Sequence, residues 1–130
     1  MQSLRGYIFS RSFMGERVPQ HIQNLIIRDY CNKNGYQFLL SATEYAMEGC
    51  HLIFDQLMDD LVDIDGVALY SLFQLPIDNL KRDEILSHVL NKKKSLHFAV
   101  EGLRLETLED KNRVDDIWKI KLVLPHCLNY

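Results

Sequence analysis

Serine, arginine and glutamate side chains are gathered in one short segment near the N-terminus. Residues 5–10, RGYIFS, are rich in aromatic and β-branched types, as expected of a buried strand. The charged segment follows directly and carries Ser10, Arg11, Ser12, Glu16 and Arg17. Two arginines close to the start of the next helix suit a phosphate or a carboxylate, because guanidinium forks and unpaired helix N–H groups both favour oxyanions. The segment therefore predicts an anion-binding site.

Polar side chains also follow the other apolar segments of the chain. In a parallel sheet the carboxyl ends of the strands meet at one edge, and ligands bind there in open α/β folds. The candidate catalytic residues are Glu16 or Glu44, as the general acid or base, and Ser10. The candidate substrate-binding residues are Arg11, Ser12, Arg17, Gln20, Tyr45, Ser71, Gln74 and Glu101. The alternative is that these are ordinary loop residues with local ion pairs, such as Glu101 with Arg104.

The strong motifs of nucleotide and metal enzymes are missing from the sequence. It contains no G-x-x-x-x-G-K-[ST], no G-x-G-x-x-G after the first strand, no H-E-x-x-H and no G-x-S-x-G. The 5 histidines have no ligand-like spacing, and the 3 cysteines include no C-x-x-C pair. We therefore expect neither a metal site nor a cofactor, and we expect a reducing cytoplasm as the setting.

Strand-like and helix-like patterns alternate along the chain. Strands are predicted over residues 5–10, 36–42, 67–73 and 95–101. Helices are predicted over residues 19–33, 51–64, 77–93 and 106–124. This order predicts the α/β class, with three layers in which a mainly parallel four-stranded sheet has helices on both faces.

The first predicted helix has an apolar stripe that indicates how it faces the sheet. Ile22, Leu25, Ile26 and Tyr30 recur at spacings of three and four residues, whereas Gln23 falls outside this stripe. The stripe is therefore predicted to pack on the sheet. Pro19 suits the first turn, and the Asn-Gly pair at 34–35 ends the helix.

Length and composition favour one soluble domain. The chain has 130 residues and 47% hydrophobic content, enough for a single domain over 1–130 with a core of residues 4–105. The net charge of -3 weighs against a nucleic-acid partner, which needs clustered cations. No apolar run approaches the roughly 20 residues that span a bilayer, so no membrane partner is expected either.

The last predicted helix carries more apolar surface than one face needs. The segment VDDIWKIKLVL, residues 114–124, includes Trp118, Ile120, Leu122 and Val123. Such a surface on a small domain favours a homodimer or higher oligomer with this helix at the interface. The alternative is that the tail, residues 125–130, covers it within the chain.

Several phrases resemble the catalytic domain of serine recombinases of the resolvase and invertase type. They are GYIFSRS, the helix from Gln23 to Tyr30, GVALYSLFQLP and SLHFAVEGLRL, which together cover about residues 4–105. The resemblance implies a resolvase-like fold. However, Phe9 and Arg11 stand where the recombinase Y-x-R-x-S motif has its arginine and nucleophilic serine, and residues 71–76 contain no arginine. Without cations for the charged transition state, DNA strand exchange is not expected.

The sequence also resembles the sporadic carbohydrate cluster proteins, which occur among bacterial genes for surface polysaccharides. The phrases RGYIFSRSFMGERVPQHIQNLIIRDYC, LYSLFQLP and HFAVE carry this resemblance over nearly the whole chain. It implies a role in the synthesis of lipopolysaccharide O-antigen or a related glycan. Other glycan-biosynthesis enzymes are the partners that this setting implies.

Two functions are compatible with these observations. The first is a cytoplasmic protein of glycan biosynthesis that binds an anionic sugar or a sugar nucleotide at the carboxyl ends of the strands, with Arg11 and Arg17 holding the anion. The second is a non-catalytic oligomeric interaction or regulatory module on a recombinase-like fold. A ligand that stabilises the folded state would distinguish them.

Overall fold

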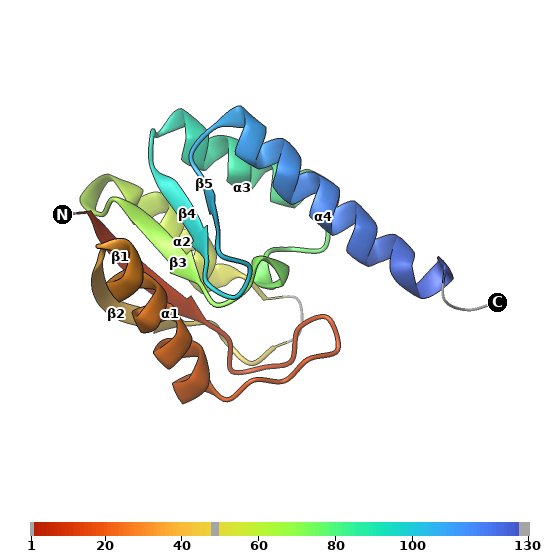
Figure 1. The fold of residues 1–130 in the computed structure, drawn as a ribbon, viewed down its shortest axis with the longest axis horizontal. Coiled ribbons are helices and arrows are strands. Elements are labelled where there is room, and N and C mark those ends of the chain that lie inside the picture. The colour runs from red at the N-terminus through yellow and green to blue at the C-terminus, as the bar shows by residue number, and fades with distance from the viewer. Residues whose placement is uncertain (1, 48–49, 128–130) are drawn as a thin grey trace.

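The chain forms one five-stranded sheet with helices packed on both faces (Figure 1). The computed structural model describes residues 2–47 and 50–127. The strands are β1 (Ser3–Ile8), β2 (Gln37–Thr43), β3 (Gly66–Leu69), β4 (Ser95–Phe98) and β5 (Leu103–Leu105), in the spatial order β2-β1-β3-β4-β5. The helices are α1 (Gln20–Asn34), α2 (Leu52–Asp59), α3 (Asn79–Asn91) and α4 (Leu108–Cys127), with two 3-10 turns, η1 (Asp60–Asp63) and η2 (Leu72–Gln74). The predicted α/β class, with a mainly parallel sheet between helices, is confirmed.

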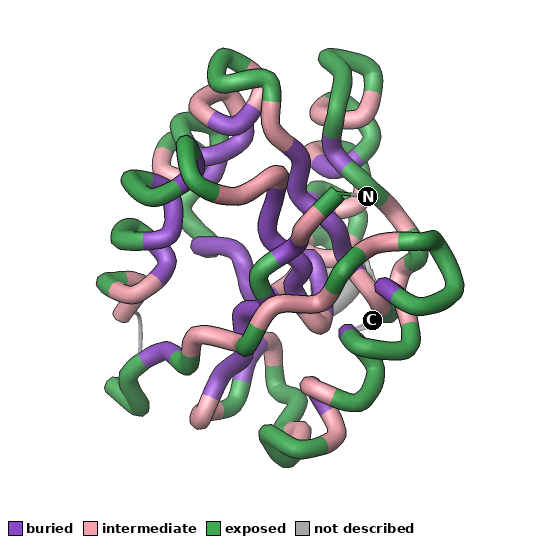
Figure 2. The backbone as a smooth tube through the Cα atoms, turned by 90° about the vertical axis from the view of Figure 1, so that its left-hand side faces the viewer, coloured by how far each residue is buried: buried purple, intermediate pink, exposed green. Residues whose placement is uncertain are grey.

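A separate apolar core lies on each face of the sheet. On one face, Ile27 and Cys31 of α1 pack with residues of β1 and β3. The other core is larger, and its members include Phe54 of α2, Leu86 of α3 and Trp118 of α4. Figure 2 shows buried backbone running through the central strands, with exposed residues in the outer loops and helix faces. The central strands are therefore shielded from water on both sides, as the strands of parallel sheets generally are.

The sheet has one strand more than predicted, and three predicted strands end early. The first, predicted over 5–10, ends at Ile8. The third strand, predicted over 67–73, ends at Leu69, because Ser71 and Gln74 form a capping box that begins η2. The fourth, predicted over 95–101, ends at Phe98. The chain then turns at Gly102, whose φ of 66° suits glycine, into the antiparallel strand β5. A strand as short as β5 has too few residues for a period-two pattern to be recognised.

Helix α1 presents a different face to the sheet from the one predicted. The buried residues are Gln23, Ile27 and Cys31, four positions apart, whereas Leu25 is 59% exposed and Ile26 is 37% exposed. The helix is thus rotated by about one residue, or roughly 100°, from the predicted orientation. The rotation places Gln23 in the core, where its side-chain amide forms hydrogen bonds to the backbone of Phe9 and Val18. These bonds account for the rotation.

Helix α4 crosses the sheet face and then runs on beyond the globular body (Figure 1). Trp118 is fully buried within the chain, so it is not part of an exposed apolar surface as predicted. Ile120 is 62% exposed and Val123 is 52% exposed. The tail predicted as their alternative cover, residues 125–130, lies outside the residues whose side chains are described. Over the described ranges, no helix is both long and apolar enough to span a membrane.

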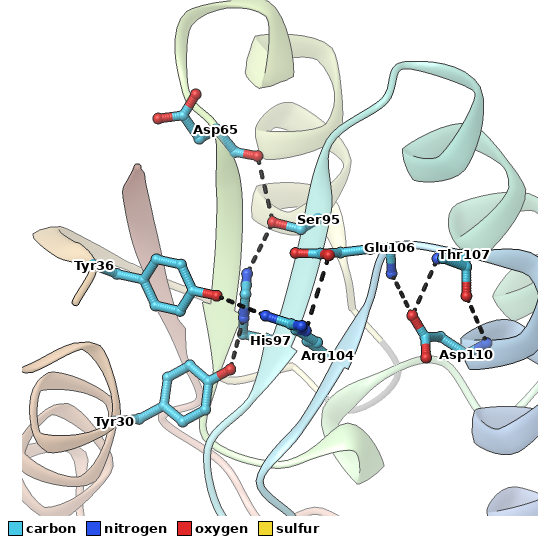
Figure 3. A network of polar contacts seen from close by, with 9 residues as sticks. All are labelled: Tyr30, Tyr36, Asp65, Ser95, His97, Arg104, Glu106, Thr107 and Asp110. Atoms are coloured by element: carbon cyan, nitrogen blue, oxygen red, sulfur yellow. Dashed lines mark hydrogen bonds and ion pairs between the residues drawn. The ribbon is translucent and has the colours of Figure 1, made fainter. Parts of the chain in front are cut away.

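A buried histidine links α1 to β4 on the α1 side of the sheet (Figure 3). His97 Nδ1 lies 2.7 Å from the Tyr30 hydroxyl, and His97 Nε2 lies 2.8 Å from Ser95 Oγ. A Cβ on Gly66 would collide with Ser95, so glycine lets β3 approach β4 closely at this point. Burial, and then the charge of Arg104, lower the pKa of His97 to about 4. The imidazole is therefore neutral in the folded protein near pH 7.

Candidate functional site

The side chain of Gln23, in α1, forms hydrogen bonds to the backbone just past the end of β1. Gln23 is fully buried, and its Oε1 accepts a hydrogen bond of 2.9 Å from the Phe9 N–H. Its Nε2 donates to the carbonyl oxygens of Phe9, at 2.9 Å, and Val18, at 2.8 Å. Gln23 thus supplies the partners that a neighbouring strand would supply, and it joins both ends of the loop that carries Arg11.

The polar network continues from Gln23 across the ends of the central strands. Gln74 Nε2 donates to Gln23 Oε1 at 2.9 Å, and Gln74 Oε1 accepts from the Ser71 N–H at 3.3 Å. Ser71 Oγ in turn donates to Glu101 at 2.8 Å, and the other carboxylate oxygen of Glu101 accepts from the Leu72 N–H at 2.9 Å. The sequence predicts that Ser71, Gln74 and Glu101 converge, and they do. Their polar atoms bond one another, which favours a structural role for them.

Glu44 directly follows β2, and its side chain caps the N-terminus of α2. Its carboxylate is buried and accepts hydrogen bonds from the Tyr7 hydroxyl at 2.8 Å and from the N–H groups of Tyr45, Ile53 and Phe54 at 2.9 to 3.2 Å. Burial, and then the hydrogen bond to Glu44, raise the pKa of the Tyr7 phenol, so it remains a donor. Four donors surround this carboxylate, an arrangement that favours helix capping over the predicted acid–base role.

Two contacts hold Arg11 beside the end of the sheet. Its Nη1 donates to the Tyr45 carbonyl oxygen at 2.8 Å, and its guanidinium carbon lies 4.1 Å from the centroid of the Phe9 ring. The neighbouring Ser10 Oγ donates to the Glu44 carbonyl oxygen at 3.1 Å. The loops after β1 and β2 are therefore bonded to each other, and the guanidinium is oriented before any ligand arrives.

A cavity of about 330 Å³ opens next to Arg11. We call it the Arg11 pocket, and it is lined by Phe9, Arg11, Ser12, Phe13, Met14, His51, Phe73, Gln74, Leu75, Pro76, Ile77, Asp78 and Lys81. It lies between the loop after β1, the start of α2 and the segment from η2 to the first turn of α3. Its size is within the usual range for small-molecule sites, roughly 300–1,000 Å³.

The wall of the Arg11 pocket at residues 76–77 is fixed from behind by a buried arginine. Arg82 Nη1 donates to the carbonyl oxygens of Pro76 and Ile77, both at 3.0 Å. The Arg82 guanidinium also lies 4.4 Å from the centroid of the Trp118 ring in α4. Trp118 itself donates from Nε1 to the Leu72 carbonyl oxygen at 3.3 Å. The wall at residues 76–77 is thus held in position, as is Arg11 in the wall formed by the loop after β1.

The structure separates the two arginines that the sequence pairs at one anion site. Arg11 and Ser12 line the pocket, whereas Arg17 and Gln20 are exposed and lie outside its lining. Glu16 is exposed too, in a two-residue turn in which Met14 and Gly15 both have positive φ and the backbones of Phe13 and Glu16 pair. Only the backbone of Tyr45 takes part in the contacts of this region: its carbonyl oxygen accepts from Arg11, and its N–H donates to Glu44. Its side chain is 52% exposed.

On the second side of the pocket, sequence reasoning found Gln74 but missed the other residues. Lys81, Asp78 and Phe73 come from a segment that the sequence presents as a strand end and an ordinary helix start. The available signal was Asp78 as a helix N-cap preceded by Leu75-Pro76, because an N-cap places the following turn at the carboxyl edge of the sheet. In the two described ranges, no group of three or more His, Cys, Asp or Glu residues is arranged to hold a metal ion.

Comparison with known proteins identifies the fold and nothing finer. No protein-family model matches the chain. No curated protein matches it. Among solved structures, a resolvase family site-specific recombinase from Streptococcus pneumoniae is similar, with a TM-score of 0.66, 11% identity, and coverage of 95% of this chain and 91% of that one. The N-terminal catalytic domain of TP901-1 integrase is similar with a TM-score of 0.56 and 18% identity, over 97% of this chain and 99% of that one. The predicted resolvase-catalytic-domain-like fold is thereby confirmed.

Proposed function

We propose that the protein binds an anionic sugar or a sugar nucleotide in the Arg11 pocket, as a cytoplasmic component of bacterial surface-polysaccharide biosynthesis. The observation that carries the binding proposal is the pre-oriented guanidinium of Arg11 at the edge of a cavity by the carboxyl ends of the strands. A held guanidinium loses little freedom when it meets an oxyanion, so its charge-assisted bonds contribute more to affinity. The glycan setting rests on the sequence resemblance to the sporadic carbohydrate cluster proteins.

The proposal is one of binding, and it names no reaction. Of the candidate acids and bases, Glu44 caps α2 and Glu16 lies outside the pocket lining. Ser10 donates its hydroxyl to a backbone carbonyl group. None of these arrangements places a proton-transfer group beside Arg11. The proposal therefore stops at ligand binding.

A thermal-shift screen tests the binding proposal. Sugar nucleotides, sugar phosphates and acidic sugars are added to the purified protein, and a ligand of the folded state raises its melting temperature. The shift should disappear in Arg11→Ala and persist in Arg17→Ala. Arg17 is a matched control, because it lies in the same loop but outside the pocket. If no compound in these classes raises the melting temperature, the proposal is wrong.

A second candidate function is a non-catalytic oligomeric module. The observation that favours it is the exposure of Ile120 and Val123 in the C-terminal half of α4, a helix that extends beyond the body (Figure 1). Apolar side chains on a projecting helix are well placed to pack against a second chain. The two functions are compatible, because α4 and the Arg11 pocket use different surfaces.

A further inference from the structure

The lining of the Arg11 pocket contains a second cation, Lys81. Lys81 lies in the first turn of α3, whereas Arg11 lies in the loop after β1, so the two cations come from different elements. The pocket contains one carboxylate side chain, that of Asp78, and this carboxylate accepts a hydrogen bond of 3.4 Å from the Leu80 N–H as the N-cap of α3. Two cations from different elements against one capping carboxylate therefore favour an anionic ligand in the pocket.

Apart from Ser12 and the charged residues Arg11, Asp78 and Lys81, the pocket offers few polar groups for sugar hydroxyls. Gln74 uses its side-chain amide within the buried network, with Oε1 bonded to Ser71 and Nε2 to Gln23. His51 Nε2 lies 3.1 Å from the Gln74 carbonyl oxygen. A monosaccharide needs several directed hydrogen bonds to replace its hydration, because an unpaired buried hydroxyl is costly. The pocket is poorly equipped to meet that requirement.

The rest of the pocket is apolar and partly aromatic. Phe9, Phe13 and Leu75 are buried and form its floor, while Phe73 is half-buried and Ile77 is 60% exposed. Phe73 is held in place from behind by an edge-to-face contact with Trp118, at 5.2 Å between ring centroids. Such a surface suits a flat, hydrophobic group, and a nucleobase gains roughly 1–3 kcal/mol by stacking on an aromatic side chain.

We infer that the ligand is a nucleoside diphosphate or its sugar ester, with the diphosphate between Arg11 and Lys81 and the base against the Phe73 wall. This inference rests on the proposed function and narrows its ligand class from anionic sugars in general to nucleotides. A cavity of about 330 Å³ is near the lower end of the range for ligand sites, so a sugar on the second phosphate extends toward solvent. Lys81 is then the residue that distinguishes a diphosphate from a single carboxylate.

Isothermal titration calorimetry with defined probes tests this assignment. The probes are UDP, GDP, dTDP, their monophosphates, UDP-glucose, and glucuronic acid as an acidic sugar without a nucleotide. We expect at least one diphosphate to bind, and Lys81→Met to weaken its binding roughly tenfold to a hundredfold while it weakens binding of the monophosphate less. Lys81→Arg should retain most of the affinity. Lys92→Met, at the other end of α3, is the matched control and should bind as the unmodified protein does.

Each outcome separates this inference from the function on which it rests. Binding of glucuronic acid as tight as that of any diphosphate, or a diphosphate affinity that Lys81→Met leaves unchanged, would overturn the nucleotide inference and leave the binding proposal standing. If neither nucleotides nor acidic sugars bind, both fail. Melting temperatures of the lysine variants show whether each one is folded, and Lys81→Gln, which also removes the charge, replaces Lys81→Met as the decisive comparison if the methionine variant is not.

Discussion

The side-chain amide of Gln23 bonds both backbone groups of Phe9, its N–H and its carbonyl oxygen, each at 2.9 Å. A helix side chain thus completes the hydrogen bonding of a residue that lies just past the end of β1. Because Arg11 is two residues further along, its position depends on this pairing. The glutamine therefore supports the candidate site without lining the Arg11 pocket.

Gln23→Leu should destabilise the fold strongly. The substitution removes the partner of the Phe9 N–H, the donor to Phe9 and Val18, and the acceptor of Gln74, all within the interior. Each buried polar group without a partner costs about 1–3 kcal/mol, so we expect a loss of roughly 3–5 kcal/mol in the free energy of unfolding. Urea denaturation measures it. Gln20→Leu, on the exposed start of the same helix, should change it by less than about 0.5 kcal/mol.

Arg11→Lys should weaken ligand binding about tenfold or more. A lysine keeps the charge, but it cannot both stack its cation flat on Phe9 and donate in parallel to the Tyr45 carbonyl group and a ligand. The comparison is with Arg17→Lys, which should bind normally. Calorimetry with the tightest ligand from the screen measures the effect. Equal affinity in both variants would show that the guanidinium shape is irrelevant to the site.

Stability should fall as the pH is lowered from about 6.5 towards 4, because of His97. The groups that face this imidazole are Tyr30, Tyr36, Ser95 and Arg104, and none of them is an anion at these pH values. The folded-state pKa is about 4, and the unfolded value is about 6.5, so the unfolded chain binds more protons in this window. The full effect is on the order of 3 kcal/mol.

The pH effect is measured by urea denaturation at a series of pH values. In His97→Gln, the free energy of unfolding should depend less steeply on pH between 4 and 6.5. His21→Gln is the control, because His21 is exposed in α1. An unaltered slope in His97→Gln would assign the acid sensitivity to other groups.

The protein should form a homodimer or higher oligomer through α4. Ile120 and Val123 are exposed in its C-terminal half, and a self-complementary contact there would bury both. Light scattering at tens of micromolar should give a mass at least twice that of the chain, and Ile120→Asp with Val123→Asp should give a monomer with unchanged helical content. A monomeric unmodified protein would contradict the prediction.

The protein should not bind duplex DNA specifically. Its net charge is -3, and the segment from Ser71 to Pro76 carries a neutral amide network and no arginine. Phosphate contacts need clustered cations, and at about 0.2 M salt such contacts normally weaken by orders of magnitude. A gel shift that persists at this salt concentration in the presence of competitor DNA would refute the prediction.

The sequence predicts the elements of this fold better than their faces and ends. The strand–helix alternation was sufficient for the α/β class, because few topologies accommodate it. The predicted orientation of α1 is wrong, because periodicity treats Gln23 as a surface residue. Its side-chain amide bonds backbone groups that only the folded chain brings near. The end of β3 was missed because Ser71 and Gln74 form local hydrogen bonds that an apolar pattern does not show.

The candidate site was predicted in part. Arg11 and Ser12 follow a recognisable strand, and the structure places both at the pocket, together with the predicted Gln74. Lys81 is separated from Arg11 by about half of the chain, and nothing in its local sequence distinguishes it from a solvated helix lysine. Glu44 was expected to be chemically available, but the N–H groups of α2 that occupy it become visible only when that helix is placed in space.

Phe73 belongs to the Arg11 pocket on one side and contacts Trp118 on the other. Trp118 is the only tryptophan in the sequence. Trp118 is therefore an intrinsic fluorescence probe that contacts a residue of the pocket lining, Phe73. We expect occupation of the pocket to shift or stiffen Phe73 and so to change the wavelength or intensity of the Trp118 emission. Ligand binding can be followed in the unlabelled protein by this signal, with Phe73→Leu as the variant that disconnects the probe.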